Sequence, residues 1–210
     1  MEKIDIVIIG AGIAGIASAY YLQKNFPNIR FKILESRSSV GGTWDQMRFP
    51  GVRADNDMYT YGFSFDPWKG SIIGNGKEIK NYLNKVTDKF NIKKNILFDT
   101  EVRSLNWKDN KWVIKTDPKK FVSQYIICCT GSRDRKNPHL PKFKNEKIYQ
   151  GKIIHTQAWG NTDIKDKNVT IVGSGCTAIT MAPSIIKEAK KVTLVQRSPA
   201  WIINIDSKEK

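Results

Sequence analysis

The sequence has few of the residues that build metal sites and disulfide frameworks. Its 210 residues include three cysteines and two histidines, His139 and His155. Cys128, Cys129 and Cys176 form no CxxC pair and no zinc-ligand spacing, and adjacent residues of a strand point to opposite faces. We therefore predict that the cysteines are reduced and structural, that no metal is bound, and that no redox-active dithiol operates.

Long hydrophobic runs are also missing. No apolar run reaches the ~18 to 20 residues that a membrane-spanning helix needs. The start, "MEKIDIVIIG", carries an acidic residue and no small-residue cleavage site, so it does not resemble a secretory signal. We expect a soluble, globular, cytoplasmic protein without a membrane span.

Acidic residues are too few to balance the basic ones. The chain has 35 Lys and Arg against 20 Asp and Glu, which gives a formal net charge of +15. Such an excess can mark a nucleic-acid binder, but here the lysines are scattered among Asn and Ile rather than clustered. We predict solvated faces and no nucleic-acid partner; a non-enzymatic basic RNA-binding protein is the competing class.

The N-terminal segment has the pattern of a dinucleotide-binding unit. An apolar run at 4–9 predicts a buried strand, "GAGIAG" a tight turn, and residues 16–26 a helix ended by a proline. Gly10 permits the turn, Gly12 lets a pyrophosphate approach the backbone, and Gly15 allows close packing of the helix. Glu35 ends the next strand, twenty residues past Gly15, where it can bind a ribose hydroxyl. Phosphates would lie at the helix N-terminus.

A second copy of this pattern begins at residue 168. In "NVTIVGSGCTAIT", Gly173 and Gly175 repeat the turn, and Ala178 takes the third position, which tolerates alanine. The following strand has Gln196 in place of the acid, and Arg197 comes next. Without the acid, and with a guanidinium present, a 2′-phosphate is favoured, so the second copy predicts NADP.

The residues between the two copies predict an inserted hairpin and a ligand-surrounding loop. The expected order is a long loop without periodicity (36–76), an amphipathic helix (79–90), two strands joined by a turn at Asp109-Asn110 (101–116), a buried strand (124–131), and a polar connector (132–167).

Two dinucleotide sites of different preference indicate electron transfer from NADPH to a second dinucleotide, most economically FAD. Reduced flavin passes electrons to a disulfide, another carrier or dioxygen. Since the sequence has no CxxC dithiol, dioxygen is the leading acceptor.

With these motifs in view, the chain resembles the flavin-dependent monooxygenases of the Baeyer-Villiger branch, most closely the ethionamide-activating type, across essentially all 210 residues. The segments "ILESRSSVGGTWD", "RFPGVRADNDMYTYGFSF" and "QRSP" carry the resemblance together with both glycine turns. Most specific is Tyr149-x-Gly151-xxx-His155-xxx-Trp159, similar to the fingerprint FxGxxxHxxxW(P/D), with Tyr for the leading Phe and Gly160 for the trailing Pro.

The resemblance implies a role for each matching residue. It assigns the FAD phosphates and ribose to Gly10, Gly12, Ala14, Gly15 and Glu35, and the lining of the flavin to Thr43, Trp44, Asp45, Asp55, Tyr61 and Val102. It assigns NADP contacts to Arg53, Ser174, Gly175, Cys176, Thr177, Ala178, Arg197 and Ser198. His155 and Trp159 belong to the linker fingerprint, which affects cofactor handling. Asp55 matches the catalytic-site carboxylate that orients an arginine, which lies beyond residue 210 in the family.

The predicted fold is α/β: a Rossmann-like FAD-binding domain with an inserted β-hairpin (1–145), a linker (146–167), and the start of a second, Rossmann-like NADP-binding domain (168–210) with an exposed sheet edge. The resemblance implies that NADPH reduces FAD and that dioxygen then gives a C4a-peroxyflavin, which oxygenates a ketone or a sulfur or nitrogen centre of a small molecule. We interpret the chain as the N-terminal part of such an enzyme, with little or no turnover alone. The alternative is a non-catalytic dinucleotide-binding module completed by a separate partner.

Overall fold

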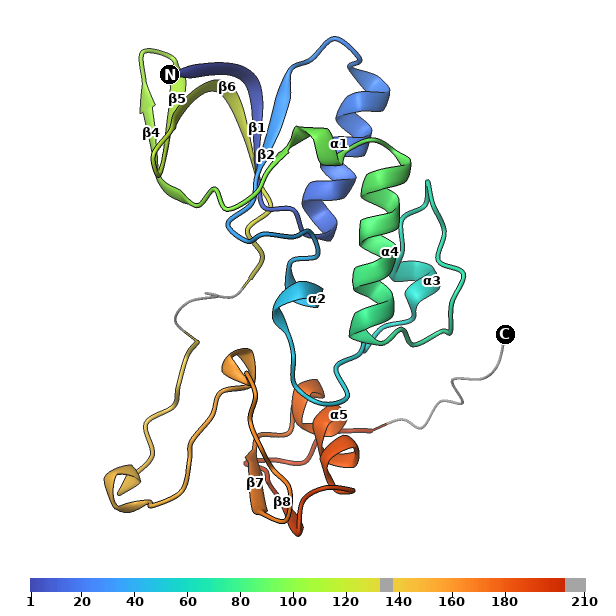
Figure 1. The fold of residues 1–210 in the computed structure, drawn as a ribbon, viewed down its shortest axis with the longest axis vertical. Coiled ribbons are helices and arrows are strands. Elements are labelled where there is room, and N and C mark those ends of the chain that lie inside the picture. Colours follow the sequence, from blue (N-terminus) through green and yellow to red (C-terminus); the bar gives the residue numbers. More distant parts are fainter. Residues whose placement is uncertain (133–137, 203–210) are drawn as a thin grey trace. The chain divides into compact units, whose positions relative to one another are not determined.

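The computed structural model describes residues 1–132 and 138–202 (Figure 1). The chain divides into two compact units. The first consists of Met1–Asp45, Phe63–Asp66 and Lys77–Ser132, and the second of Gln46–Gly62, Pro67–Gly76 and the described residues from 138 onward. Each unit is described by itself below.

The first unit contains a mixed six-stranded sheet. Its strands lie in the order β3-β2-β1-β6-β5-β4. The first four of these are parallel neighbours, whereas β5 is antiparallel to both β6 and β4. The bounds are β1 Glu2–Ile9, β2 Phe31–Leu34, β3 Ile96–Leu97, β4 Val102–Lys108, β5 Lys111–Thr116 and β6 Lys120–Cys128. This arrangement confirms the predicted α/β class with an inserted hairpin.

Helix α1 (Ile13–Asn25) links β1 to β2, and α4 (Gly76–Lys89) lies beside it (Figure 1). The predicted apolar stripe of α4 is observed, because Ile79, Leu83 and Val86 are fully buried. A single-turn 3-10 helix, η1 (Lys93–Asn95), leads into β3. A cluster of buried residues of the sheet is formed by Ile4, Val7, Ile9, Leu34, Ile114 and Phe121.

The hairpin turn is where the sequence placed it. Lys108 pairs with Lys111, and the two residues between them, Asp109 and Asn110, have φ values of 52° and 56°. Positive φ at both central positions is typical of the type I′ turn, whose twist matches that of paired strands.

Strand β6 differs from its prediction as a buried strand. Tyr125 is 61% exposed, although its partner in the register, Ile6, is 8% exposed. The apolar cover over β1 therefore does not extend to this part of β6. The apolar run indicated the strand correctly, but it could not indicate how far the cover reaches.

The long loop predicted at 36–76 contains two short helices that the sequence analysis missed. These are α2 (Thr43–Gln46) and α3 (Met58–Tyr61). The side chain of Asp57 caps α3 by accepting a hydrogen bond from the Thr60 N–H at 2.8 Å. A single turn is too short for hydrophobic periodicity to reveal, so only the capping aspartate marked it.

The second unit holds a two-stranded parallel sheet. Strands β7 (Asn168–Val172) and β8 (Lys191–Val195) are joined through α5 (Cys176–Ile185), which contains Pro183. The 3-10 helices η2 (Glu146–Ile148) and η3 (Thr156–Ala158) precede them. The core combines residues of the 46–62 segment with those of the sheet and α5, namely Met47, Phe49, Ile164, Ile171, Ala178, Met181 and Ile185.

Apolar residues of this small sheet are exposed. Val172 is 59%, Leu194 36% and Val195 47% exposed. Within the described residues β8 pairs with β7 alone. The expected exposure of these strands is therefore observed.

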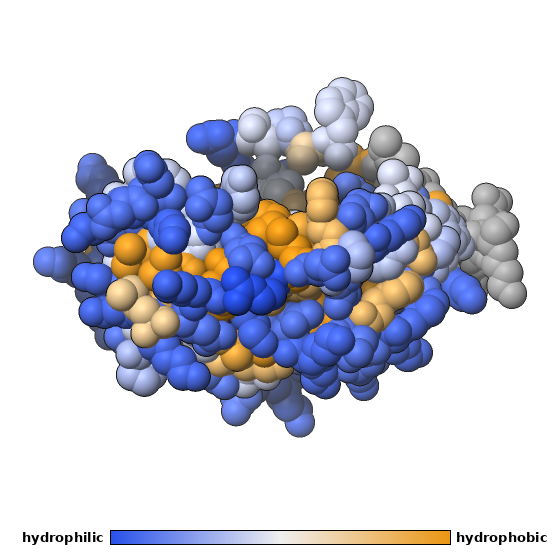
Figure 2. All heavy atoms as spheres, turned by 90° about the horizontal axis from the view of Figure 1, so that it is seen from above, coloured by the Kyte–Doolittle hydropathy of each residue, from blue (hydrophilic) through white to orange (hydrophobic). Residues whose placement is uncertain are grey.

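Hydrophilic residues dominate the face drawn in Figure 2, where apolar residues are visible between them. This agrees with the scattering of charged side chains along the sequence. In residues 1–132 and 138–202, no helix combines the length and the apolar character that crossing a membrane requires.

Candidate functional site: two glycine turns

The first glycine turn joins β1 to α1, and the fold itself requires two of its glycines. Gly10 has a φ of +103°, and a Cβ there would lie 2.4 Å from the Cys129 carbonyl oxygen. A Cβ at Gly15 would lie 1.9 Å from the Gly10 carbonyl oxygen. No side chain fits at either position, so helix α1 can pack tightly on the strand end.

The middle glycine is different. Gly12, at the N-cap of α1, has an ordinary φ of −78°, and the nearest atom to its Cβ position is the Gly42 Cα at 3.6 Å. That distance is an ordinary van der Waals contact. Neither backbone strain nor internal crowding therefore explains a glycine at this position.

The second turn repeats the geometry of the first. Gly173 has a φ of +132°, and its N–H donates to the Val195 carbonyl at 2.9 Å, as Gly10 donates to Leu34 at 2.9 Å. Gly175, at the N-cap of α5, has a φ of −75°, and no described atom lies within 4 Å of its Cβ position. As at Gly12, neither backbone strain nor internal crowding explains why residue 175 is a glycine.

The third position separates the two turns. Ala178 occupies the place that Gly15 has in the first turn, and it is buried at 6% exposure. The packing of α5 therefore leaves room for a methyl group at this position, whereas the packing of α1 does not.

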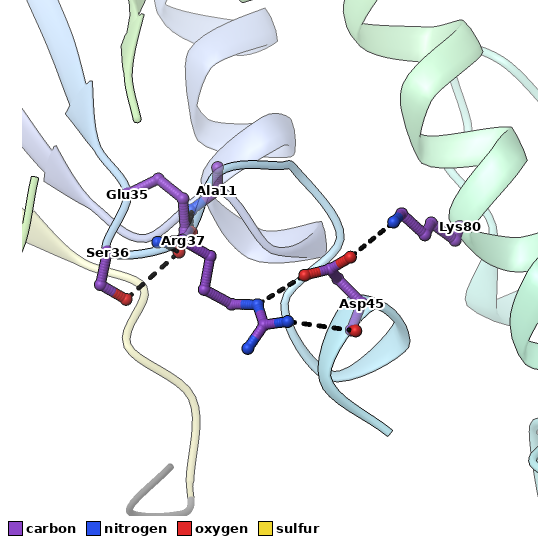
Figure 3. A network of polar contacts seen from close by, with 6 residues as sticks. All are labelled: Ala11, Glu35, Ser36, Arg37, Asp45 and Lys80. Carbon is purple, nitrogen blue, oxygen red and sulfur yellow. Dashed lines mark hydrogen bonds and ion pairs between the residues drawn. The ribbon is translucent and has the colours of Figure 1, made fainter. Parts of the chain in front are cut away.

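Glu35 follows β2 and reaches into the first turn (Figure 3). It is 1% exposed. Its Oε2 accepts the Ala11 N–H at 2.7 Å, and its Oε1 accepts the Arg37 N–H at 2.9 Å and the Ser36 hydroxyl at 3.3 Å. The carboxylate that the sequence placed at the ribose position is thus fixed beside the glycine turn.

Asp45 lies in the same network. Its Oδ2 pairs with Arg37 Nε and its Oδ1 with Lys80 Nζ, both at 2.5 Å (Figure 3). Burial raises the pKa of this carboxyl, but the hydrogen bonds from Lys80, Arg37 and Ser39 outweigh it and hold the pKa at about 2. Asp45 is therefore a charged, fully partnered carboxylate at neutral pH.

The other residues assigned to the first site belong to several elements of the two units. Ala14 lies exposed in the first turn of α1. Thr43 is exposed and Trp44 half-buried in α2. Val102 packs against the buried cluster that includes Ile114 and Phe121. Tyr61 ends α3 in the second unit.

In the second unit Asp55 meets the second glycine turn. Its carboxylate accepts a hydrogen bond from the Cys176 thiol, and this bond, with burial, raises the pKa of the thiol. Arg53 is exposed and forms a backbone bridge with Asn75. Ser174 and Thr177 are half-buried around the start of α5.

The fingerprint residues lie at η3. His155 Nδ1 accepts the Gln157 N–H at 3.2 Å and so caps this short helix, while Trp159 packs against the core of the second unit. Arg197 and Ser198 follow β8 and are exposed. The Gly173 N–H of the second turn donates to the carbonyl of Val195, the last residue of β8. Arg197 and Ser198 follow Val195 by two and three residues.

Sequence reasoning missed Arg37 and Lys80. A cation two residues after the ribose-site acid was a local signal for Arg37. Lys80 gave none, because 35 residues separate it from Asp45 and only folding brings them together.

Comparisons with known proteins agree with this geometry. Residues 7–209 match the family "Pyridine nucleotide-disulphide oxidoreductase". Over 99% of its length the chain is 41% identical to a probable FAD-binding monooxygenase, AlmA, of Acinetobacter baylyi, and over 97% it is 38% identical to the FAD-containing monooxygenase EthA of Mycobacterium tuberculosis. These matches cover 44% and 43% of the two relatives.

A solved structure shows the same fold. Cyclohexanone monooxygenase from Rhodococcus sp. Phi1 bound to NADP+ is similar with a TM-score of 0.83 and 27% identity, covering 97% of this chain and 40% of that protein. The chain thus spans less than half the length of the proteins it matches. The resemblance seen in the motifs is confirmed, and the match over residues 7–209 shows that the chain belongs to the pyridine nucleotide-disulphide oxidoreductase family, where its relatives are flavin-dependent monooxygenases.

Proposed function

We propose that this chain forms the FAD- and NADPH-binding part of a monooxygenase that uses dioxygen to oxygenate a ketone or a sulfur or nitrogen centre. One observation carries the proposal. Gly12 and Gly175 occupy equivalent positions, and the fold requires a glycine at neither of them. Close approach of a phosphate group to the backbone explains glycine at both.

The first turn fits FAD. Helix α1 begins at a glycine, which has no side chain to cap the N–H groups of Ile13 and Ala14, so these donors can bind phosphate oxygens. The Glu35 carboxylate directly follows β2 and is held beside the glycine turn by Ala11, Ser36 and Arg37, at the position where this fold binds a ribose hydroxyl. When bound, FAD supplies the redox chemistry and the reaction with dioxygen.

The second turn fits NADPH. Gln196 stands where the first copy has Glu35, so no carboxylate repels a 2′-phosphate, and the exposed Arg197 supplies a cation beside it. The turn from Ser174 to Ala178 starts a helix whose N-terminal N–H groups favour phosphates.

Dioxygen is proposed as the electron acceptor because the cysteines are unsuited to disulfide exchange. Cys128, Cys129 and Cys176 are all free, and burial raises the pKa of the Cys129 thiol. A reactive dithiol needs a thiolate of lowered pKa.

The remaining assignments stay predictions from the resemblance. They comprise the flavin-lining roles of Thr43, Trp44, Asp45, Tyr61 and Val102, the orienting role of Asp55, the NADP contact of Arg53, the linker roles of His155 and Trp159, and the division at residues 145 and 167.

The test uses the purified full chain. We expect FAD to bind with quenching of its fluorescence, and NADPH to reduce bound FAD faster than NADH under anaerobic conditions. Oxygen uptake with a ketone or a thioether then tests the oxygenation step, for which we expect little or no turnover from this chain alone. A colourless protein that binds no FAD but shifts RNA would overturn the proposal.

A further inference from the structure

The hairpin of β4 and β5 carries positive charge that its own carboxylates do not neutralise (Figure 1). Residues 101–120 include six basic and three acidic residues. Two of the acids, Glu101 and Asp117, pair with Arg103 at 2.7 and 3.0 Å. Asp109 remains as the one further carboxylate of this segment against five exposed lysines. Within residues 1–132 and 138–202 none of these lysines forms an ion pair, so the hairpin presents a net positive surface to solvent.

Four of the five lysines lie directly opposite one another in the sheet. The register pairs Lys108 of β4 with Lys111 of β5. It also pairs Lys115 of β5 with Lys120 of β6. Because residues 111 and 115 are four apart in one strand, both pairs lie on the same face. Like charges directly opposite each other destabilise a sheet, so the stability of the fold does not explain this arrangement, whereas an anionic partner would relieve it.

The other face of the hairpin carries a pair of tryptophans beside the first lysine pair. Trp107 and Trp112 are cross-strand partners, and their ring centroids lie 5.3 Å apart. Trp112 is half-buried and packs against the buried cluster that includes Phe121. Trp107 belongs to β4, an edge strand of the sheet, and is 52% exposed. A large aromatic ring is therefore held at the surface, one residue away from Lys108.

This combination fits the surface of an anionic lipid bilayer. Tryptophan is enriched at membrane interfaces, because its ring is apolar and its N–H is polar. Lysines beside such a ring can extend their ammonium groups to anionic headgroups. A nucleic acid fits less well, since planar guanidinium groups are preferred for phosphate and base recognition, and the hairpin's single arginine, Arg103, is already paired with two carboxylates.

We propose that the hairpin tip, residues 107–112, docks the protein on an anionic lipid surface. The tip contains the turn and the last residue pairs of both strands, so an end-on approach brings both of its faces to the bilayer. Trp107 then lies at the interface, and Lys108 and Lys111 lie among the headgroups. The inference is independent of the proposed function, because neither FAD nor NADPH takes part in the docking.

Co-sedimentation of the full chain with lipid vesicles tests the docking. At low salt we expect phosphatidylglycerol vesicles to be bound at least about tenfold more tightly than phosphatidylcholine vesicles, and we expect added salt to weaken this binding. Lys108→Gln combined with Lys111→Gln should lower the affinity for phosphatidylglycerol vesicles about tenfold. Lys187→Gln combined with Lys190→Gln is the matched control. It removes the same charge from exposed positions of the second unit and should change the affinity less than about twofold.

Two further measurements separate the ring from the charges. Trp107→Ala should weaken binding to phosphatidylglycerol vesicles about threefold or more and leave its salt dependence unchanged, because no charge is lost. The variant with both Lys108→Gln and Lys111→Gln should melt at or above the wild-type temperature, since a like-charge pair is gone, and this shows that it is folded.

Equal binding of the two kinds of vesicle would overturn the proposal. Equal affinity of the hairpin lysine variant and its control for phosphatidylglycerol vesicles would also overturn it. Binding of single-stranded RNA, without binding of anionic vesicles, would overturn it in favour of a nucleic-acid surface.

Discussion

Replacing Glu35 tests the ribose assignment and the glycine turn together. In the wild type this carboxylate is buried and accepts the Ala11 N–H at 2.7 Å. Glu35→Ala removes the acceptor and leaves a donor of the turn without its partner. The variant should therefore be affected both in its folding stability and in its FAD affinity, and the two effects have different sizes.

The stability effect follows from the orphaned donor. A buried N–H without an acceptor costs about 1–3 kcal/mol, and we expect the free energy of unfolding to fall by that amount. The affinity effect follows from the lost ribose bond. A hydrogen bond to a charged group contributes about 1.5–3 kcal/mol, so FAD binding should weaken about 10- to 150-fold.

Urea unfolding of the ligand-free protein measures the first effect, and titration of FAD fluorescence the second. Glu2→Ala is the matched control, since it removes an exposed carboxylate at the start of β1. FAD affinity within twofold of the wild type, in a folded Glu35→Ala variant, would refute the ribose assignment.

Three further predictions concern the glycines and the charges. Gly15→Ala places a methyl group 1.9 Å from the Gly10 carbonyl oxygen and should prevent folding, which circular dichroism measures. Gly175→Ala, by contrast, should keep the wild-type melting temperature and lose NADPH affinity. Equal melting temperatures in the two variants would contradict the packing argument. The pKa of Asp45 is held at about 2 against 3.8, so it contributes about 2 kcal/mol that is fully present above about pH 4 and is lost as the pH falls towards 2. Acid unfolding curves of Asp45→Asn should lack this part of the pH dependence, and curves parallel to the wild type would refute it. Arg197→Ala should weaken NADPH binding about tenfold and NADH binding hardly at all, and equal weakening would count against the 2′-phosphate role.

Features set by local chain geometry could be predicted from the sequence. The strand, the glycines and the helix of the first unit follow one another without a gap, so their spacing fixes their positions. The same is true of the Asp109-Asn110 turn, because both residues tolerate a positive φ. Glu35 could be predicted because it directly follows the strand that pairs with β1.

Features that depend on distant contacts could not be predicted. The pairing of Asp45 with Lys80 joins α2 to a helix 35 residues away, and no local pattern specifies it. The burial of Met47 and Phe49 against β7 and α5 is of the same kind. The exposure of Tyr125 depends on which element covers β6, and an apolar run alone does not contain that information.

The bond between Cys176 and Asp55 bears on how the protein withstands oxidants. Thiolates, not thiols, are the species that peroxide and alkylating agents attack. Because the pKa of the Cys176 thiol is raised above its usual range, this sulfur stays protonated at neutral pH although it is exposed at the start of α5. Peroxide and alkylating agents should therefore react more slowly with Cys176 than with an exposed thiol that has no such partner.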